Sequence, residues 1–286
     1  MDKDNRILGP EDYLEPACPL CEEPYGVTPA AKPVPQQRII EKMDEYMSRR
    51  DYAGAERHLV YWLEEAQLGK DLRGELMLRN ELVGHYRKTG DKDKALAHGD
   101  RALELLKVLD FEKTLSAGTT FVNVATANSA FGGYERAAAL FEKAREVYEE
   151  ESGGYLENRP ELLGGLYNNM ALNYAAMKDY AKAHELYDKA MAVMEKVPNG
   201  VLEQAITCLN RANAIEDEKG LEEGESSINA LLDEAEQLLD TPSVPRNGYY
   251  AFVCEKCAPT FSYYGYFLTA EDLKRRAEEI YGRMAE

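Results

Sequence analysis

Four of the five cysteines form two pairs with the spacing that zinc sites use. The pairs are Cys18-Pro-Leu-Cys21 and Cys254-Glu-Lys-Cys257. A gap of two residues lets both sulfurs of a pair reach one ion, at about 2.3 Å in tetrahedral geometry, and two such pairs supply four thiolates. The sequence therefore allows a structural zinc site on Cys18, Cys21, Cys254 and Cys257.

Core packing is a second interpretation of these cysteines. Cys254 and Cys257 lie on the apolar stripe of a predicted helix, where free cysteine behaves as a small hydrophobe. The two pairs are 233 residues apart (254 − 21), so residues 18–21 would have to reach the end of the chain. Pro259 ends or kinks the helix beside Cys257 and could turn the pair outward. Structural zinc, core packing and a reducible thiol pair all stay open.

Catalytic spacings are mostly absent from the chain. We find no GxGxxG after a strand pattern, no GxxxxGK[ST], no HExxH and no GxSxG. With 52 Asp and Glu, paired carboxylates are inevitable and are expected on solvated faces. We therefore expect that the chain is not an enzyme. Four histidines on separate helical segments are expected at surface or half-buried positions, namely His58, His85, His98 and His184.

Asparagine recurs at one place in the predicted helices. Asn123, Asn169 and Asn210 take equivalent places, each two residues before an alanine, and the residue in between is apolar in the first two cases. Asparagine is a mediocre helix former, so its recurrence needs another reason. A side-chain amide offers both a donor and an acceptor, as a peptide bond does. These amides either contact a bound peptide or cap and bridge neighbouring helices.

Residues 164–196 contain a helical hairpin that would position such side chains. Two helix-period stripes are joined there by a turn at Lys178 and Asp179. Small residues let the two helix backbones approach, and tyrosines fill the remaining space. Neither helix can bury its stripe alone, so hairpins must stack. The stripes are Tyr167, Met170, Ala171 and Tyr174, and then Tyr180, Ala183, Tyr187 and Ala190.

The hairpin pattern recurs from Val34 to the end of the chain and predicts six helix pairs. Pro242, Pro245 and Gly248 predict a loop over residues 240–248. Turn signals occur at Asp51, Gly90–Asp91, Gly132–Gly133, Lys178–Asp179, Gly220 and Gly265. Equivalent small residues follow at Ala55, Ala95, Ala137, Ala183, Gly224 and Ala270, with offsets of 40, 42, 46, 41 and 46 residues.

This pattern resembles the tetratricopeptide repeat (TPR), in the kinesin-light-chain-like variety with longer helices. The resemblance rests on the order Tyr-Asn-Asn-Met-Ala at residues 167–171 and on the aromatic and small residues after it. It implies an all-α, right-handed superhelix of about six TPR helix pairs over residues 35–286. The concave groove of such a superhelix binds partners.

In similar TPR proteins the matching asparagine points into the groove and hydrogen-bonds an extended peptide. The resemblance thus implies a protein–protein interaction scaffold. One alternative is a peptide-sensing TPR receptor, which usually carries a DNA-binding or effector domain that is not visible here. Another is a structural protein in which zinc links the N-terminal arm to the last repeat. The implied groove residues are Asn80, Arg87, Asn123, Asn168, Asn169, Asn210 and Asn213.

Residues 1–34 are predicted to form an irregular, Pro-rich arm. Seven of the 12 prolines fall in or at the end of this stretch, which forbids a long helix. Apolar residues at positions 7–8, 13–14, 20 and 25 predict that parts of the arm pack against the helical body. A wholly disordered arm is the alternative.

The charge of the chain restricts its partners. Subtracting 52 Asp and Glu from 34 Lys and Arg gives −18. This field repels phosphate backbones and anionic lipid, so we expect a protein or peptide partner, preferably basic, rather than nucleic acid or membrane. No apolar run approaches the roughly 20 residues that span a bilayer, and the acidic N-terminal residues do not resemble a signal peptide. We expect a cytoplasmic protein.

Overall fold

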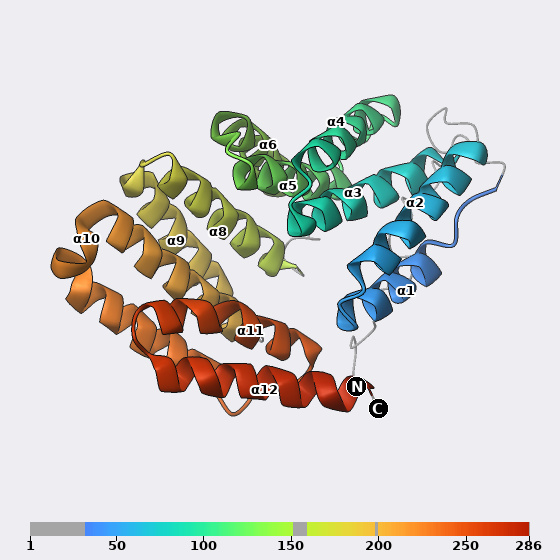
Figure 1. Cartoon of the computed structure of the whole chain (residues 1–286). Coiled ribbons are helices and arrows are strands. Elements are labelled where there is room, and N and C mark those ends of the chain that lie inside the picture. Colours follow the sequence, from blue (N-terminus) through green and yellow to red (C-terminus); the bar gives the residue numbers. More distant parts are fainter. Residues whose placement is uncertain (1–31, 151–158, 198–199, 286) are drawn as a thin grey trace, which may run out of the picture. The chain divides into compact units, whose positions relative to one another are not determined.

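The computed structural model describes residues 32–150, 159–197 and 200–285, and every regular element in these ranges is an α-helix (Figure 1). The all-α prediction is therefore confirmed. The chain divides into two compact units, Met1–Phe131 and Gly132–Glu286. Each unit is described by itself below. Cys18, Cys21 and most of the predicted arm lie outside the described residues.

Unit 1 consists of consecutive antiparallel helices. Asp51, Asp71 and Asp91 begin three of them, because each carboxylate accepts a hydrogen bond from the backbone N–H three residues later. Thr114 caps a fourth helix in the same way. The helices are α1 (Gln36–Ser48), α2 (Tyr52–Leu68), α3 (Leu72–Thr89), α4 (Lys92–Val108) and α5 (Leu115–Ala130).

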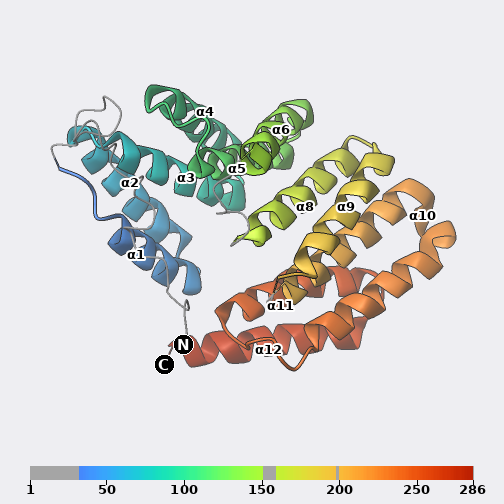
Figure 2. The same ribbon diagram turned by 180° about the vertical axis from the view of Figure 1, so that it is seen from behind.

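Unit 2 continues the same architecture, as the view from behind also shows (Figure 2). Its longest helix contains a kink at Gly220, where φ is 80° and ψ is 167°, so it forms both helices of one hairpin. The predicted loop over residues 240–248 separates the last two hairpins. The helices are α6 (Tyr134–Glu150), α8 (Pro160–Ala176), α9 (Tyr180–Met194), α10 (Val201–Leu239), α11 (Gly248–Tyr263) and α12 (Phe267–Ala285).

The six predicted turns are all confirmed. Gly90, Gly132, Gly220 and Gly265 have φ between 80° and 86°, a left-handed conformation that only glycine adopts without strain. At the other two turns Arg50 and Lys178 take a positive φ instead. The sequence therefore places the hairpin turns correctly, counting the kink in α10 as one of them.

The predicted small positions are all buried. Ala55, Ala95, Ala137 and Ala183 are completely buried, and Gly224 and Ala270 are buried as well. A larger side chain at these positions would push the helices of a hairpin apart. Burial at all six positions agrees with the helix register that the small residues predict.

Val34, which precedes the first helix, is fixed by contacts within unit 1. Val34 packs into the core around Ile39 and Leu59, and its backbone N–H donates to Asp71 Oδ2 over 2.9 Å. The proposed boundary between residues 34 and 35 stays a prediction, as do the superhelix and the packing of the arm.

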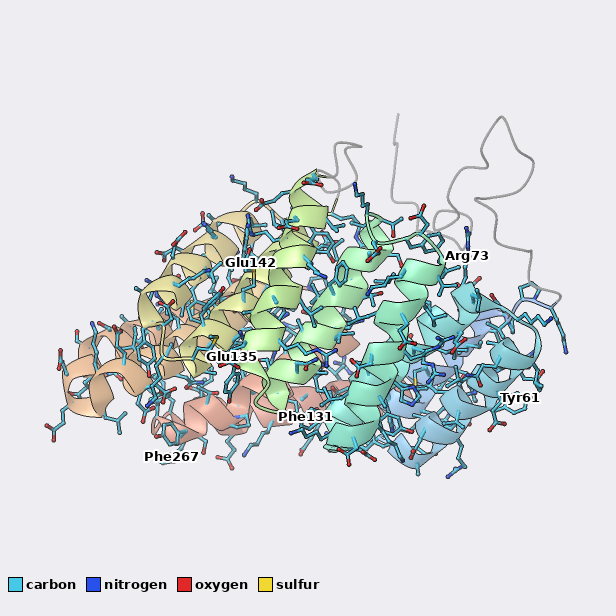
Figure 3. The ribbon with its side chains drawn as sticks, turned by 90° about the horizontal axis from the view of Figure 1, so that it is seen from above. Tyr61, Arg73, Phe131, Glu135, Glu142 and Phe267 are labelled. Atoms are coloured by element: carbon cyan, nitrogen blue, oxygen red, sulfur yellow. The ribbon has the colours of Figure 1, made fainter. Side chains whose placement is uncertain are left out.

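Several large apolar side chains remain in contact with water. Tyr61 on α2 is 54% exposed, and Phe267 at the start of α12 is 67% exposed (Figure 3). Across the described part of the chain, no helix is both long and apolar enough to cross a bilayer.

Candidate functional site

In unit 1, two of the predicted groove asparagines meet on neighbouring helices. Asn80 lies on α3 and Asn123 on α5, and Asn123 Nδ2 donates to Asn80 Oδ1 over 3.3 Å. Asn80 Nδ2 in turn donates to Leu76 O over 3.1 Å and to Thr120 Oγ1 over 3.0 Å. Both amides are half-buried. We call Asn80 and Asn123 the unit 1 amide pair.

Unit 2 repeats this arrangement on α8 and the first half of α10. Asn210 Nδ2 donates to Asn168 Oδ1 over 3.3 Å. We call Asn168 and Asn210 the unit 2 amide pair. Asn169, the residue that the sequence pattern aligned with Asn210, is half-buried beside this pair, and it has no hydrogen bond to any residue that the structure describes.

Each amide pair uses only part of its hydrogen-bonding capacity. Asn123 and Asn210 donate through nitrogen, and their Oδ1 atoms have no partner in the described ranges. Asn168 accepts through oxygen, which leaves its NH₂ group unused in the same ranges. A row that presents both donors and acceptors can pair with a peptide backbone. The helix-bridging role considered from the sequence is present, and the groove role of these residues stays a prediction.

Two other predicted groove residues lie on the same helices. Arg87 on α3 is exposed and forms no hydrogen bond or ion pair within the described part of the chain. Asn213 on α10 is exposed, and its Oδ1 lies 3.1 Å from the hydroxyl of Tyr264. Arg87 is therefore available to a ligand, whereas Asn213 is held by Tyr264, the residue that follows α11.

Two helical glycines stand beside the amide pairs. Gly84 is one turn after Asn80 on α3, and Gly165 is one turn before Asn169 on α8. A Cβ atom added at either position would meet nothing within 4 Å. By contrast, a Cβ at Gly164 would lie 2.5 Å from Met194 Cε. Packing therefore explains Gly164 but neither Gly84 nor Gly165.

Glu81, a carboxylate, directly follows Asn80 of the unit 1 amide pair on α3. Desolvation raises the pKa of Glu81, and the negative charge of Asp44 raises it further. Desolvation also raises the pKa of Asp44. This part of unit 1 is therefore electrostatically suited to a positively charged group.

A buried ionic network in unit 1 was missed from the sequence. Glu75 is 3% exposed and binds Arg79 Nη2 over 2.9 Å and Arg101 Nε over 3.4 Å. Arg79 Nη1 also lies 3.0 Å from His98 Nδ1. Desolvation, with the charges of Arg79 and Lys94, lowers the pKa of His98 to about 4. The spacing of four residues between Glu75 and Arg79, which is typical of ion pairs on a helix, could have indicated this contact from the sequence.

His85 corrects one expectation from the sequence. It was predicted at a surface or half-buried position, but it is 4% exposed and lies edge-on to Tyr86. Desolvation lowers the pKa of His85 and favours its neutral form. Its burial follows from its place on the inner side of α3, which a lone histidine does not reveal.

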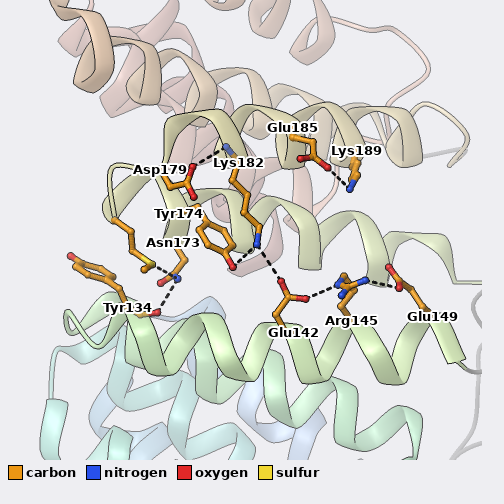
Figure 4. A network of polar contacts seen from close by, with 11 residues as sticks. Tyr134, Glu142, Arg145, Glu149, Asn173, Tyr174, Asp179, Lys182, Glu185 and Lys189 are labelled. Carbon is orange, nitrogen blue, oxygen red and sulfur yellow. Dashed lines mark hydrogen bonds and ion pairs between the residues drawn. The ribbon is translucent and has the colours of Figure 1, made fainter.

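A polar network in unit 2 holds α6 against the hairpin of α8 and α9 (Figure 4). Asn173 Nδ2 donates to the carbonyl of Tyr134 over 3.0 Å. Lys182 Nζ lies 2.8 Å from the Tyr174 hydroxyl and 3.6 Å from Glu142 Oε1. These contacts join packed helices, so the network is structural, although the buried Asn173 Oδ1 has no hydrogen-bond partner in the described residues.

The cysteines of α11 face the core. Cys254 is completely buried and Cys257 is 2% exposed, so Pro259, which lies inside α11, does not turn them outward. Desolvation raises the pKa of Cys257 to about 12. Within the described ranges, no group of three or more His, Cys, Asp or Glu could hold a metal ion. With Cys18 and Cys21 outside these ranges, the zinc site stays a prediction.

Each unit consists of helical hairpins, and in each unit an amide pair joins two successive first helices. Residues 75–150 match one tetratricopeptide repeat family model, and residues 164–197 match another of the same description. Residues 75–150 and 164–197 therefore contain tetratricopeptide repeats, as the sequence resemblance predicted. Such repeats are generally modules for protein–protein interaction.

Comparison with solved structures supports the fold. The chain is similar to BtubC (BKLC) from P. vanneervenii, with a TM-score of 0.59 and 19% sequence identity. The similarity covers 74% of this chain and 84% of BtubC. No protein with a curated description matches the chain in sequence.

Proposed function

We propose that this protein is an interaction scaffold, not an enzyme, that holds an extended segment of a partner protein along the first helices of its hairpins. The contacts are made in unit 1 by Asn80 and Asn123, and in unit 2 by Asn168, Asn169 and Asn210. The observation that carries the proposal is the unused hydrogen-bonding capacity of the two amide pairs.

The pairing of the amides favours binding. Each asparagine that bonds to its neighbour is already fixed in one rotamer, so less side-chain entropy is lost when a peptide arrives. The free carbonyl oxygens accept from peptide N–H groups, and the free NH₂ groups donate to peptide carbonyls. Recognition of this kind depends on the backbone of the partner more than on its sequence.

The two unpacked glycines support the same conclusion. Glycine inside a helix costs about 1 kcal/mol relative to alanine, and nothing within 4 Å of Gly84 or Gly165 compensates for that cost. A glycine on a binding face permits close approach of a ligand backbone, because it has no side chain to hold the ligand away.

Charge adds a preference among partners. The chain carries a net charge of −18, and Glu81, which follows Asn80 on α3, lies close enough to Asp44 for their charges to interact. A basic segment is attracted to this surface, with an affinity that falls as salt screens the charges.

The test is capture of partners from cell extract by the full chain and by a triple variant, Asn123→Ala, Asn169→Ala and Asn210→Ala. Gln237→Ala is the control, because it removes an exposed amide from the second half of α10. We expect the triple variant to lose partners that wild type and control both retain. A folded triple variant that keeps every partner at full affinity would show that the amide rows are not the binding face.

A further inference from the structure

Aromatic side chains form a stripe along the exposed face of α11. Tyr249, Phe252 and Tyr263 are 47%, 43% and 65% exposed. Their helical spacing of three and eleven residues places them on one face. The rings of Tyr249 and Phe252 stack, with their centroids 6.2 Å apart. Exposed rings gathered on one face mark an interaction surface, because leaving them in water is unfavourable.

Each end of the stripe is anchored to a carboxylate on α10. The hydroxyl of Tyr263 donates to Glu216 Oε1 over 2.5 Å, and the hydroxyl of Tyr264 lies 2.7 Å from Glu216 Oε2. At the other end, the hydroxyl of Tyr249 donates to Glu203. We call these groups, with Phe252, the aromatic–acidic face.

The two carboxylates differ in the charges around them. Tyrosine hydroxyls satisfy the oxygen lone pairs of Glu216 without neutralising it, and no Lys or Arg forms an ion pair with Glu216 in the described residues. Asp217 beside it adds to the negative potential. Glu203 differs, because the positive charge of Lys256 lies near it. The Glu216 end therefore attracts a cation more strongly.

We propose that the aromatic–acidic face binds a segment of a partner protein that carries two arginine or lysine side chains about six residues apart. The inference rests on the proposed function, since it assigns a chemistry to the partner of unit 2. A guanidinium group can lie over an exposed tyrosine ring while its N–H groups donate to the carboxylate below.

The spacing follows from helix geometry. Tyr249 and Tyr263 are 14 residues apart on α11, or about 21 Å at 1.5 Å per residue. An extended peptide covers this length with roughly six residues. Two cations at this separation reach the two carboxylates at the same time, and the effective concentration of the second strengthens binding of the first.

The N-terminal arm of the chain is a poor occupant for this face. Residues 1–31 contain seven Asp and Glu but only two Lys and Arg, Lys3 and Arg6, which lie three residues apart. Carboxylates of the arm would be repelled by Glu203, Glu216 and Asp217. Charge complementarity therefore favours a basic segment of another protein.

The experiment titrates the full chain with a fluorescent peptide that carries two arginines separated by six positions. A second peptide has citrulline in place of arginine, which keeps the shape but removes the charge. The variants are Glu216→Gln and Tyr263→Ala. Their controls are Glu185→Gln, which removes an exposed carboxylate from α9, and Tyr61→Ala, which removes an exposed ring from α2.

We expect the arginine peptide to bind at least about tenfold more tightly than the citrulline peptide. Glu216→Gln and Tyr263→Ala should each weaken it several-fold, while both controls bind as wild type does. Equal binding of the two peptides, no binding of the arginine peptide, or equal affinities for Glu216→Gln and Glu185→Gln would overturn the inference.

Failure of this inference can be distinguished from failure of the proposed function. If Asn210→Ala weakens binding of a captured partner and Glu216→Gln does not, the amide row stands and the preference for cations is wrong. If Glu216→Gln alone weakens it, the aromatic–acidic face stands and the amide row is wrong.

Discussion

Removal of one buried hydroxyl group should leave the protein as stable as before or more stable. The side chain of Tyr187 on α9 is completely buried, and its hydroxyl finds no hydrogen-bond partner in the described part of the chain. An unsatisfied buried polar group costs about 1–3 kcal/mol. Tyr187→Phe removes that cost and keeps the packed ring, so the free energy of unfolding should rise by up to about 2 kcal/mol.

Tyr250 provides the matched control, since it is also completely buried in unit 2. Its hydroxyl donates to Leu239 O over 3.2 Å and accepts from Arg276 Nη1 over 2.8 Å. Tyr250→Phe removes both hydrogen bonds, including the one from the charged Arg276, and should destabilise by about 1–3 kcal/mol even though Arg246 Nη1 still donates to Leu239 O. The two substitutions delete the same atom and should act in opposite directions.

Urea denaturation and thermal melting measure both effects. A change of 1 kcal/mol corresponds to a shift of about 2–4 °C in Tm for a domain of this size. If Tyr187→Phe destabilises by 1 kcal/mol or more, the hydroxyl has a partner and the position of Tyr187 in α9 is wrong. If both variants change stability in the same direction and by the same amount, the hydrogen bonds of the hydroxyl group do not decide the effect of its removal.

Three further predictions test other parts of the structure. The pKa of His98 is lowered from 6.5 to about 4, because the folded protein disfavours its charged form. The contribution of neutral His98 to stability is therefore fully present above pH 6.5. That contribution, on the order of 2–3 kcal/mol, is lost as pH falls from 6.5 to 4, so urea denaturation of His98→Asn across this range should show a flatter profile than wild type. Ala183→Leu overfills a completely buried position and should lower stability by about 1–3 kcal/mol, whereas Ala192→Leu, at an exposed position of the same helix, should change a thermal melt little. Because Cys254 and Cys257 are buried, we expect their thiols to react with a disulfide reagent only after the protein unfolds. One equivalent of zinc in the native protein, lost on Cys18→Ser, would instead establish the four-cysteine site.

The periodic features of the fold could be predicted from the sequence. Turn residues and small residues recur because each hairpin must turn and must let its two helices approach, and both demands restrict residue type at fixed positions. Gly220 is an example, since its φ of 80° and ψ of 167° exclude other residues without strain. Ala183 is another, because its burial leaves no space for a larger side chain.

The details of the site depended on contacts between hairpins, which the sequence does not specify. The pattern aligned Asn169 with Asn210, but the rotation of α8 against α10 brings Asn168 into contact with Asn210 instead. Gly165 looked like any helical glycine until the space around it was known. The unpaired charge of Glu216 likewise depends on which side chains of α11 reach α10.

The measurement that tests the binding face most directly is the affinity of Gly165→Ala for a captured partner segment. Gly282→Ala on α12 is the control, because a Cβ there also meets nothing within 4 Å. Alanine should raise or preserve stability at both positions. We predict that Gly165→Ala is at least as stable as wild type but binds the segment several-fold more weakly, while Gly282→Ala binds normally. Equal affinity for both variants would contradict a peptide lying against α8.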